Sequence, residues 1–179
     1  MKLWQKNIAS LTEVETFTVG KDKELDIYLA PFDVLGSLAH IQMLQTINLL
    51  TVEELRVLQE GLKGIYKDIE SGTFIMENEA EDIHSQVEAL LTRKYGDAGK
   101  KIHSARSRND QVLVDLKLYL RHEIEQLVNE VKDFFDLLIG QSEKYKDYLV
   151  PGYTHLQLAM PYHSDFGSAL MLKVLQTIW

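Results

Sequence analysis

The sequence predicts an all-α fold. Only three prolines occur in 179 residues, at positions 31, 151 and 161, so long stretches of the chain are free to form helices. Apolar residues recur every three or four positions through most of the sequence, whereas the alternation that is typical of strands is rare. A strand anywhere in residues 31–146 would contradict this assignment.

Two helices are expected in the first part of the chain. The first begins at Pro31, whose missing N–H would be unpaired in a first turn in any case, and ends near Leu50. Its apolar residues at helical spacing are Leu35, Leu38, Ala39, Met43 and Ile47. The second begins with a capping box of Thr51 and Glu54 and ends at the Ser71-Gly72 pair. Its inward face is predicted to contain Leu55, Leu58, Leu62, Ile65 and Ile69.

A third helix is expected from about Asn78 to Tyr95, with Gly96 as its C-terminal stop. Its inward residues are predicted to be Ile83, Val87, Leu90 and Leu91.

A fourth helix, from Asp110 to Lys146, is unusually long. At about 1.5 Å per residue it would span about 55 Å, more than a small domain needs for its own core. A helix of that length usually packs in a bundle, often with other subunits. The segment that follows, PGYTHLQLAMP (151–161), is expected to form a turn or an extended segment.

Composition narrows the class of protein. The net charge of −8, from 27 acidic and 19 basic residues, argues against non-specific attraction to nucleic acid or to an anionic membrane. The absence of cysteine excludes disulfides and thiolate chemistry within these residues. The first residues, MKLWQKNIAS, lack the apolar stretch of a signal peptide, so we expect a cytoplasmic protein.

The densest positive charge lies just before the long helix. It consists of Lys100, Lys101, His103, Arg106 and Arg108, with Ser107 and Asn109 as neutral donors. A helix N-terminus attracts carboxylate or phosphate, and an arginine can hold a carboxylate with two hydrogen bonds, so this segment is a candidate anion site. Asp110 could cap the helix. The alternative is an ordinary capped helix start with surface ion pairs.

Two histidines are candidates for chemistry. His155 lies in a segment bounded by prolines, and a pKa near neutrality would suit proton transfer. The alternative is a histidine that is hydrogen-bonded in a loop. His84 follows Glu81 and Asp82, so a carboxylate–imidazole hydrogen bond is available, although a lone surface histidine is the commoner case. No pair of histidines has metal-ligand spacing, so no metal is expected.

Two segments, HSARSRNDQ (103–111) and PGYTHLQLAMP (151–161), resemble signature segments of the argininosuccinate lyase family, within the fumarase/aspartase superfamily. DVLGSLAH (33–40) and EDIH (81–84) extend the resemblance, which runs from Phe17 to Pro161. It implies an N-terminal helical lyase domain in residues 1–109. It also implies that residues 110–161 begin the superfamily's central helical bundle with its first long helix.

The resemblance implies an enzyme that reversibly eliminates fumarate from argininosuccinate and releases L-arginine, a step of arginine biosynthesis, without a cofactor. It implies that a homotetramer forms, with active sites shared between subunits. By the resemblance, the substrate is bound by Ser107, Arg108, Asn109 and Thr154. His155 takes part in proton transfer, and Asp82, His84 and Gln157 support the site.

The sequence departs from the family in two places. Gln5-Lys6 follows Trp4 where many members have Gly-Arg-Phe, and Gly20 stands where a substrate-contacting serine is usual. The family's third signature, a Ser-Ser-x-Met-Pro-x-Lys-x-Asn loop with the presumed catalytic base, does not occur in these 179 residues. The chain is therefore expected to be inactive on its own. Two alternatives are a non-catalytic, crystallin-like helical scaffold and another fumarate-releasing lyase of the superfamily.

Residues 162–179 are expected to be an atypical tail, because the resemblance stops after Pro161. If this segment is back-translated with suitable codons, another reading frame yields a helix like that of the family, so we hypothesise a shifted reading frame. The apolar stretch Leu170–Ile178 would then not have been selected to pack against this domain, so it would be disordered or would attach to a neighbouring element.

Overall fold

The computed structural model describes residues 17, 20–77 and 80–177. The chain divides into two compact units, Met1–Arg121 and His122–Trp179, and each is described by itself. The departure from the family at Trp4 lies outside the described residues.

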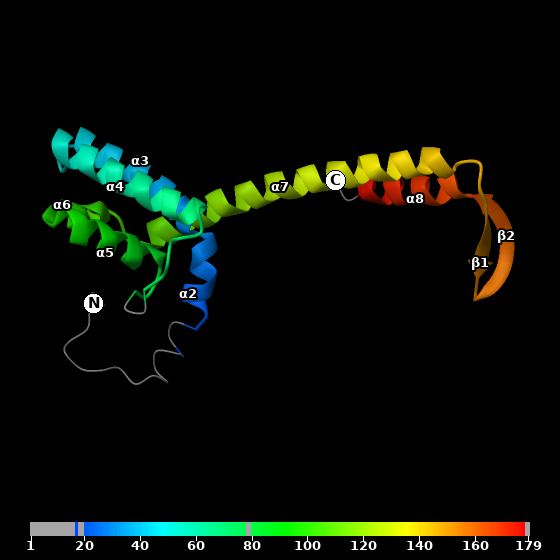
Figure 1. The fold of residues 1–179 in the computed structure, drawn as a ribbon, viewed down its shortest axis with the longest axis horizontal. Helices are drawn as coiled ribbons and strands as arrows, with labels where there is room; N and C mark the ends of the chain where they lie inside the picture. Colours follow the sequence, from blue (N-terminus) through cyan, green and yellow to red (C-terminus); the bar gives the residue numbers. More distant parts are fainter. Residues whose placement is uncertain (1–16, 18–19, 78–79, 178–179) are drawn as a thin grey trace. The chain divides into compact units, whose positions relative to one another are not determined.

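The first unit is helical (Figure 1). Its elements are α2 (Asp22–Leu25), the 3-10 helix η1 (Asp26–Tyr28), α3 (Ala30–Thr46), α4 (Val52–Glu70), α5 (Ile83–Tyr95), α6 (Asp97–Lys100), the 3-10 helix η2 (Lys101–His103) and the beginning of α7 (Arg108–Tyr145). The second unit contains the rest of α7, β1 (Leu149–Thr154), β2 (Gln157–His163) and α8 (Ser164–Thr177).

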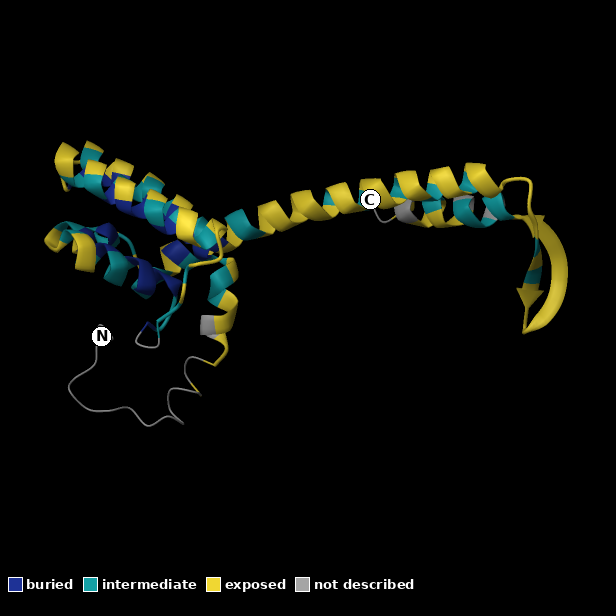
Figure 2. Ribbon diagram, viewed as in Figure 1, coloured by how far each residue is buried: buried dark blue, intermediate teal, exposed yellow. Residues whose placement is uncertain are grey.

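The core lies where α3, α4 and α5 face one another, as the dark blue residues of Figure 2 show. Each helix contributes aliphatic side chains that are almost completely removed from water. They are Ala30, Val34, Ile41, Leu44, Leu50, Leu55, Leu58, Leu62, Ile65, Ile83, Val87, Leu91 and Ile102.

The predictions for α4 are confirmed. Thr51 and Glu54 form the reciprocal capping box, with the Glu54 N–H donating to Thr51 Oγ1 over 3.1 Å and the Thr51 N–H donating to the Glu54 carboxylate over 2.8 Å. The helix ends with Ser71 as its C-cap, and its predicted inward residues are buried or partly buried against the core.

The prediction for α3 is right at its start, and the helix ends a few residues earlier than expected. Pro31 lies in the first turn, but the helix ends at Thr46, and Asn48 has a positive φ of 62°. Leu35 and Met43 are exposed, while Asp33 and Ser37 are buried. Because apolar residues occur nearly all round this helix, its periodicity could not select a face, and packing in the folded unit decides it.

The start of α5 also needs correction. The helix begins at Ile83 rather than near Asn78, because Asp82 is its N-cap and accepts a hydrogen bond from the Ser85 N–H over 2.8 Å. Gly96, with a φ of 60°, is the predicted C-terminal stop.

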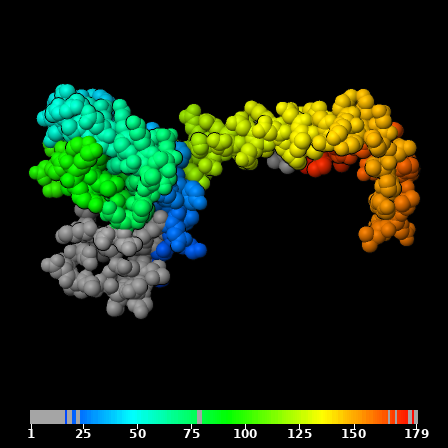
Figure 3. Space-filling view, in the orientation of Figure 1, coloured from blue at the N-terminus to red at the C-terminus, as the bar shows by residue number. Residues whose placement is uncertain are grey.

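The PGYTHLQLAMP segment forms most of an antiparallel β-hairpin, in which Leu149 pairs with His163 and Thr154 with Gln157. Figure 3 shows the hairpin in orange, extending away from the two helices of its unit. The mainly helical fold class is confirmed, and residues 31–77 and 80–146 contain no strand. Among the described helices, none combines the length and the apolarity that a membrane span requires.

Of the two alternatives for the tail, disorder does not describe Ser164–Thr177, which form α8. Hydrogen bonds tie the start of α8 to the end of α7: Ser142 Oγ donates to the Asp165 carbonyl over 3.4 Å, and Ser164 Oγ donates to the Tyr145 carbonyl. These contacts hold the first turn of α8 in place.

Candidate active site

Asp82 and Arg108, both predicted as site residues, form an ion pair. Arg108 Nε lies 3.1 Å from Asp82 Oδ2, and Arg108 Nη2 donates to Ser85 Oγ over 3.1 Å. Both partners are partly accessible, with side-chain exposures of 30% and 26%. Asp82, the N-cap of α5, therefore holds the guanidinium of Arg108 at the first turn of α7.

Ser107, rather than Asp110, caps α7. Its Oγ accepts from the Asp110 N–H over 3.3 Å, and the Asp110 carboxylate accepts from the Ser107 N–H over 2.7 Å. Hydrogen bonds from the Ser107 N–H and from its hydroxyl to the carboxylate lower the pKa of Asp110. The pair closes the N-terminus of the helix, and Asn109 lies exposed in the first turn.

Three of the basic residues before α7 have side-chain partners within the chain. Lys100 Nζ pairs with Asp97 over 2.8 Å, and Lys101 Nζ pairs with Glu54. Arg106 Nη2 donates to Ser37 Oγ over 3.0 Å. The lysines thus form the surface ion pairs that were the alternative to an anion site. Arg108 remains partly exposed beside the N-cap of α5.

His84 is buried, contrary to the surface position that is commoner for a lone histidine. Its Nδ1 lies 2.7 Å from Asp33 Oδ1 and 3.6 Å from Asp115 Oδ2. Burial and the neighbouring Asp33 raise the pKa of Asp115 to about 7, against the opposing effects of His84 and Arg106. Burial lowers the pKa of Arg106, which both carboxylates oppose. The cluster therefore joins α3, α5 and α7 through buried charge.

This cluster is also the arrangement of described residues that comes nearest to a metal site. Asp33, His84 and Asp115 each offer a ligand atom, and the three atoms lie within 4.8 Å of one another. However, His84 Nδ1 is engaged by Asp33, Arg106 already supplies positive charge, and the adjoining space has no room for a water molecule. We interpret the cluster as a hydrogen-bonded charge network.

The second unit holds Thr154, His155 and Gln157. His155 and Leu156 form the two-residue turn of the hairpin, with φ of 49° and 64°. Such a turn is normally built from glycine or asparagine, so a histidine there is held in an unusual backbone conformation. All of these side chains are exposed, which leaves His155 open to a ligand.

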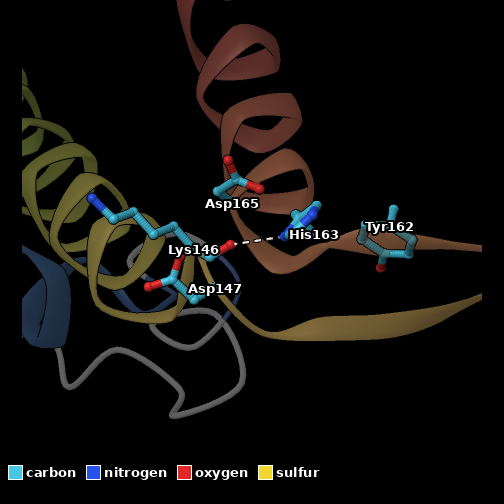
Figure 4. A pocket seen from close by; sticks show the side chains of 5 residues that line it. All are labelled: Lys146, Asp147, Tyr162, His163 and Asp165. Carbon is cyan, nitrogen blue, oxygen red and sulfur yellow. Dashed lines mark hydrogen bonds between the residues drawn. The ribbon is translucent and has the colours of Figure 1, made fainter.

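The second unit also contains an open pocket of about 570 Å³ (Figure 4). It is lined by Lys146, Asp147, Tyr162, His163 and Asp165. The His163 ring donates from Nδ1 to the Lys146 carbonyl over 3.0 Å, the bond drawn in Figure 4. None of the predicted site residues lines this pocket.

Asp33, Ser37, Arg106 and Asp115 were not predicted as a group. One signal was present for Asp33 and Ser37, because they lie four residues apart and therefore on the same side of a helix. Nothing in the sequence paired them with side chains of α5 and α7.

The chain belongs to the lyase family: a family model described as "Lyase" matches residues 7–176, a range that includes most of the predicted atypical tail.

Its curated relatives carry a more specific name. The argininosuccinate lyase of Parabacteroides distasonis is 61% identical over 166 residues, or 93% of this chain and 37% of that protein. The argininosuccinate lyase of Phocaeicola vulgatus is 60% identical over the same shares. That of Methylococcus capsulatus is 42% identical over 172 residues, 95% of this chain and 36% of that protein. The chain thus spans little more than a third of the length of these relatives.

The fold resembles that of a solved enzyme. The β-carboxy-cis,cis-muconate cycloisomerase of Acinetobacter calcoaceticus sp. ADP1 matches with a TM-score of 0.63 and 18% identity, over 93% of this chain and 38% of that chain. At that identity the likeness concerns the fold alone.

Proposed function

We propose that these residues form the N-terminal part of an argininosuccinate lyase, which cleaves argininosuccinate to L-arginine and fumarate. The observation that carries the proposal is the identity of 61% to a protein of that name over 93% of the chain. The partly exposed Arg108, which Asp82 holds at the N-terminus of α5, supports it, because a carboxylate-rich substrate needs such a donor.

The reaction is a β-elimination. A base removes the proton from the carbon next to a substrate carboxylate, and negative charge spreads into that carboxylate. The bond from the neighbouring carbon to the guanidinium nitrogen then breaks, its electron pair stays on nitrogen, and an acid protonates the leaving group. Arginine and fumarate result. Donors aimed at the charged carboxylate lower the barrier most.

In this proposal Ser107, Arg108, Asn109 and Thr154 bind the substrate. His155 transfers a proton or orients the group that does so, and its exposure at the hairpin turn supports access to the substrate. Asp82 holds Arg108 through the ion pair described above, and His84 and Gln157 support the site.

We further propose that the whole protein is a cytoplasmic homotetramer. Support comes from α7, which exposes apolar side chains at helical spacing. They include Leu113, Leu116, Leu120, Ile124 and Leu127.

The test is a chimera of residues 1–161 joined to the part of the Parabacteroides distasonis enzyme that follows its matching segment. We expect the chimera to release fumarate and arginine from argininosuccinate, and the 179-residue chain alone to serve as the inactive comparison. A folded chimera without any turnover would contradict the proposal and favour a non-catalytic scaffold. Release of fumarate with a different amine would favour another lyase of the superfamily.

A further inference from the structure

One face of α3 carries three polar side chains in a row. Asp33, Ser37 and His40 follow one another at spacings of four and three residues, so they lie along one side of the helix. Asp33 and Ser37 are each only 1% exposed. Burial of polar groups costs free energy unless they are hydrogen-bonded, so their partners indicate what they do.

Two of these side chains hold the segment that leads into α7. His40 Nε2 lies 2.8 Å from the Ser104 carbonyl, and since a carbonyl can only accept, the ring donates from this nitrogen. Ser37 Oγ accepts from Arg106 Nη2 over 3.0 Å. The third, Asp33, binds His84 on α5.

Between the two anchored residues lies a strained one. Ala105 has a φ of 59°, in the left-handed region that residues with a Cβ rarely adopt. The contacts of Ser104 and Arg106 with α3 hold the chain in this conformation. The backbone conformation at Ala105 sets the direction in which the chain continues to Ser107 and Arg108, where α7 begins.

Its contacts commit Arg106 to this role. It lies beside the carboxylates of Asp33 and Asp115 and reaches Ser37, whereas Arg108 is partly exposed beside Asp82. Of the two arginines, Arg106 is bound to α3 and anchors the segment, whereas Arg108 remains accessible to a ligand.

We propose that Asp33, Ser37 and His40 are positioning residues that set the place of Ser107 and Arg108 for substrate binding, an inference that rests on the proposed lyase function. They act through the Ser104–Arg106 segment and through α5. None of them needs to touch the substrate.

The first test uses the 179-residue chain and does not depend on its function. In His40→Leu and Ser37→Ala, we expect the amide protons of residues 107–111 and the Arg108 Nε–H to exchange about tenfold faster, the effect of losing one net hydrogen bond. His40→Gln, which can still donate to the Ser104 carbonyl, should restore slow exchange. Gln42→Ala is the matched control, because it removes a hydrogen bond of α3 to Gln59 that does not reach this segment.

The second test uses the chimera. His40→Leu and Ser37→Ala should raise KM about tenfold, with a smaller change in kcat, and His40→Gln should restore KM. Unchanged exchange and unchanged KM in folded variants would overturn the inference. Should His40→Leu fail to fold, Ser37→Ala carries the test. If the unsubstituted chimera does not cleave argininosuccinate, the proposed lyase function is refuted. In that case the exchange experiment alone shows whether Ser37 and His40 position the start of α7.

Discussion

His84 Nδ1 and Asp33 Oδ1 share a hydrogen bond of 2.7 Å between side chains that are each almost completely buried. Asp115 Oδ2 lies 3.6 Å from the same ring nitrogen and has no hydrogen-bond partner. This arrangement determines how the stability of the first unit depends on pH.

Asp115 should make the protein less stable as the pH rises from about 4 to about 7. Its pKa is raised to about 7 in the folded state, from about 4 in the unfolded chain, so the folded state binds the proton more tightly. The resulting stabilisation is complete below about pH 4 and is lost as the pH rises through 7. The charged groups around it are Asp33 on α3, His84 on α5, Arg106 and Asp26.

Asp115→Asn removes this ionisation, so the variant should lose less stability than the unsubstituted chain between pH 4 and pH 8. We expect the difference in their free energies of unfolding to shift in favour of the variant by up to about 4 kcal/mol over this range. Urea denaturation at both pH values measures this. Parallel pH profiles of the two proteins would show that Asp115 ionises normally.

Removal of His84 should be costly. His84→Leu leaves two buried carboxylates without their shared partner, and loss of one member of a buried charged pair typically costs about 3–5 kcal/mol. Urea denaturation of the 179-residue chain is the measurement. A loss below about 1 kcal/mol would mean that Arg106 alone compensates the carboxylates.

Ala105→Gly should stabilise the chain by up to about 1 kcal/mol, because glycine adopts the positive φ at this position without a steric penalty. The control is Ala89→Gly inside α5, where glycine should destabilise by about 1 kcal/mol. Thermal unfolding of both variants compares the two effects. Equal destabilisation would show that residue 105 is not strained.

Gly99→Ala should destabilise the contact between α6 and α5. A Cβ there would lie 2.4 Å from the Thr92 nitrogen and 2.6 Å from the Leu91 carbonyl oxygen, both backbone atoms that cannot rotate away. The expected loss is about 1–3 kcal/mol. Gly64→Ala, where no atom lies within 4 Å, should instead stabilise α4 by about 1 kcal/mol. Denaturation curves that rank the two variants the other way would contradict the close packing.

In the chimera, His155→Asn should lower kcat by about 10²–10⁴-fold and change KM little, because a proton transfer contributes mainly in the transition state. Arg108→Ala should also raise KM, by about tenfold or more, since it removes charged hydrogen bonds to the substrate. Arg56→Ala, an exposed arginine paired with Glu53 and Glu60 on α4, is the matched control. Steady-state kinetics of fumarate release distinguish these effects.

The reading frame of residues 162–179 remains a prediction. The formation of α8 does not decide it, since an apolar segment in any frame can form a helix. The nucleotide sequence tests it directly. A shift requires that one of the two alternative reading frames after codon 161 encodes a sequence like that of the family. If neither frame does, the hypothesis is refuted.

Features that depend on interactions between nearby residues could be predicted from the amino-acid sequence. The capping box at Thr51, the inward face of α4 and the stop at Gly96 follow from interactions within a few positions, and each was predicted. The same reasoning placed the start of α7 to within one turn, although it chose Asp110 instead of Ser107 as the cap. A capping box contains two polar residues that bond reciprocally, so residue type alone does not show which one begins the helix.

Which polar residues lie in the core, and what they bind, depends on how the helices pack. His84 meets Asp33 across 51 positions, and Arg106 meets Ser37 across 69. These pairs form only when α3, α5 and the segment before α7 pack together, and no local pattern encodes that contact. The nearly uniform apolarity of α3 left its face undetermined, and packing turned Asp33 and Ser37 inward because partners for their polar atoms were available there.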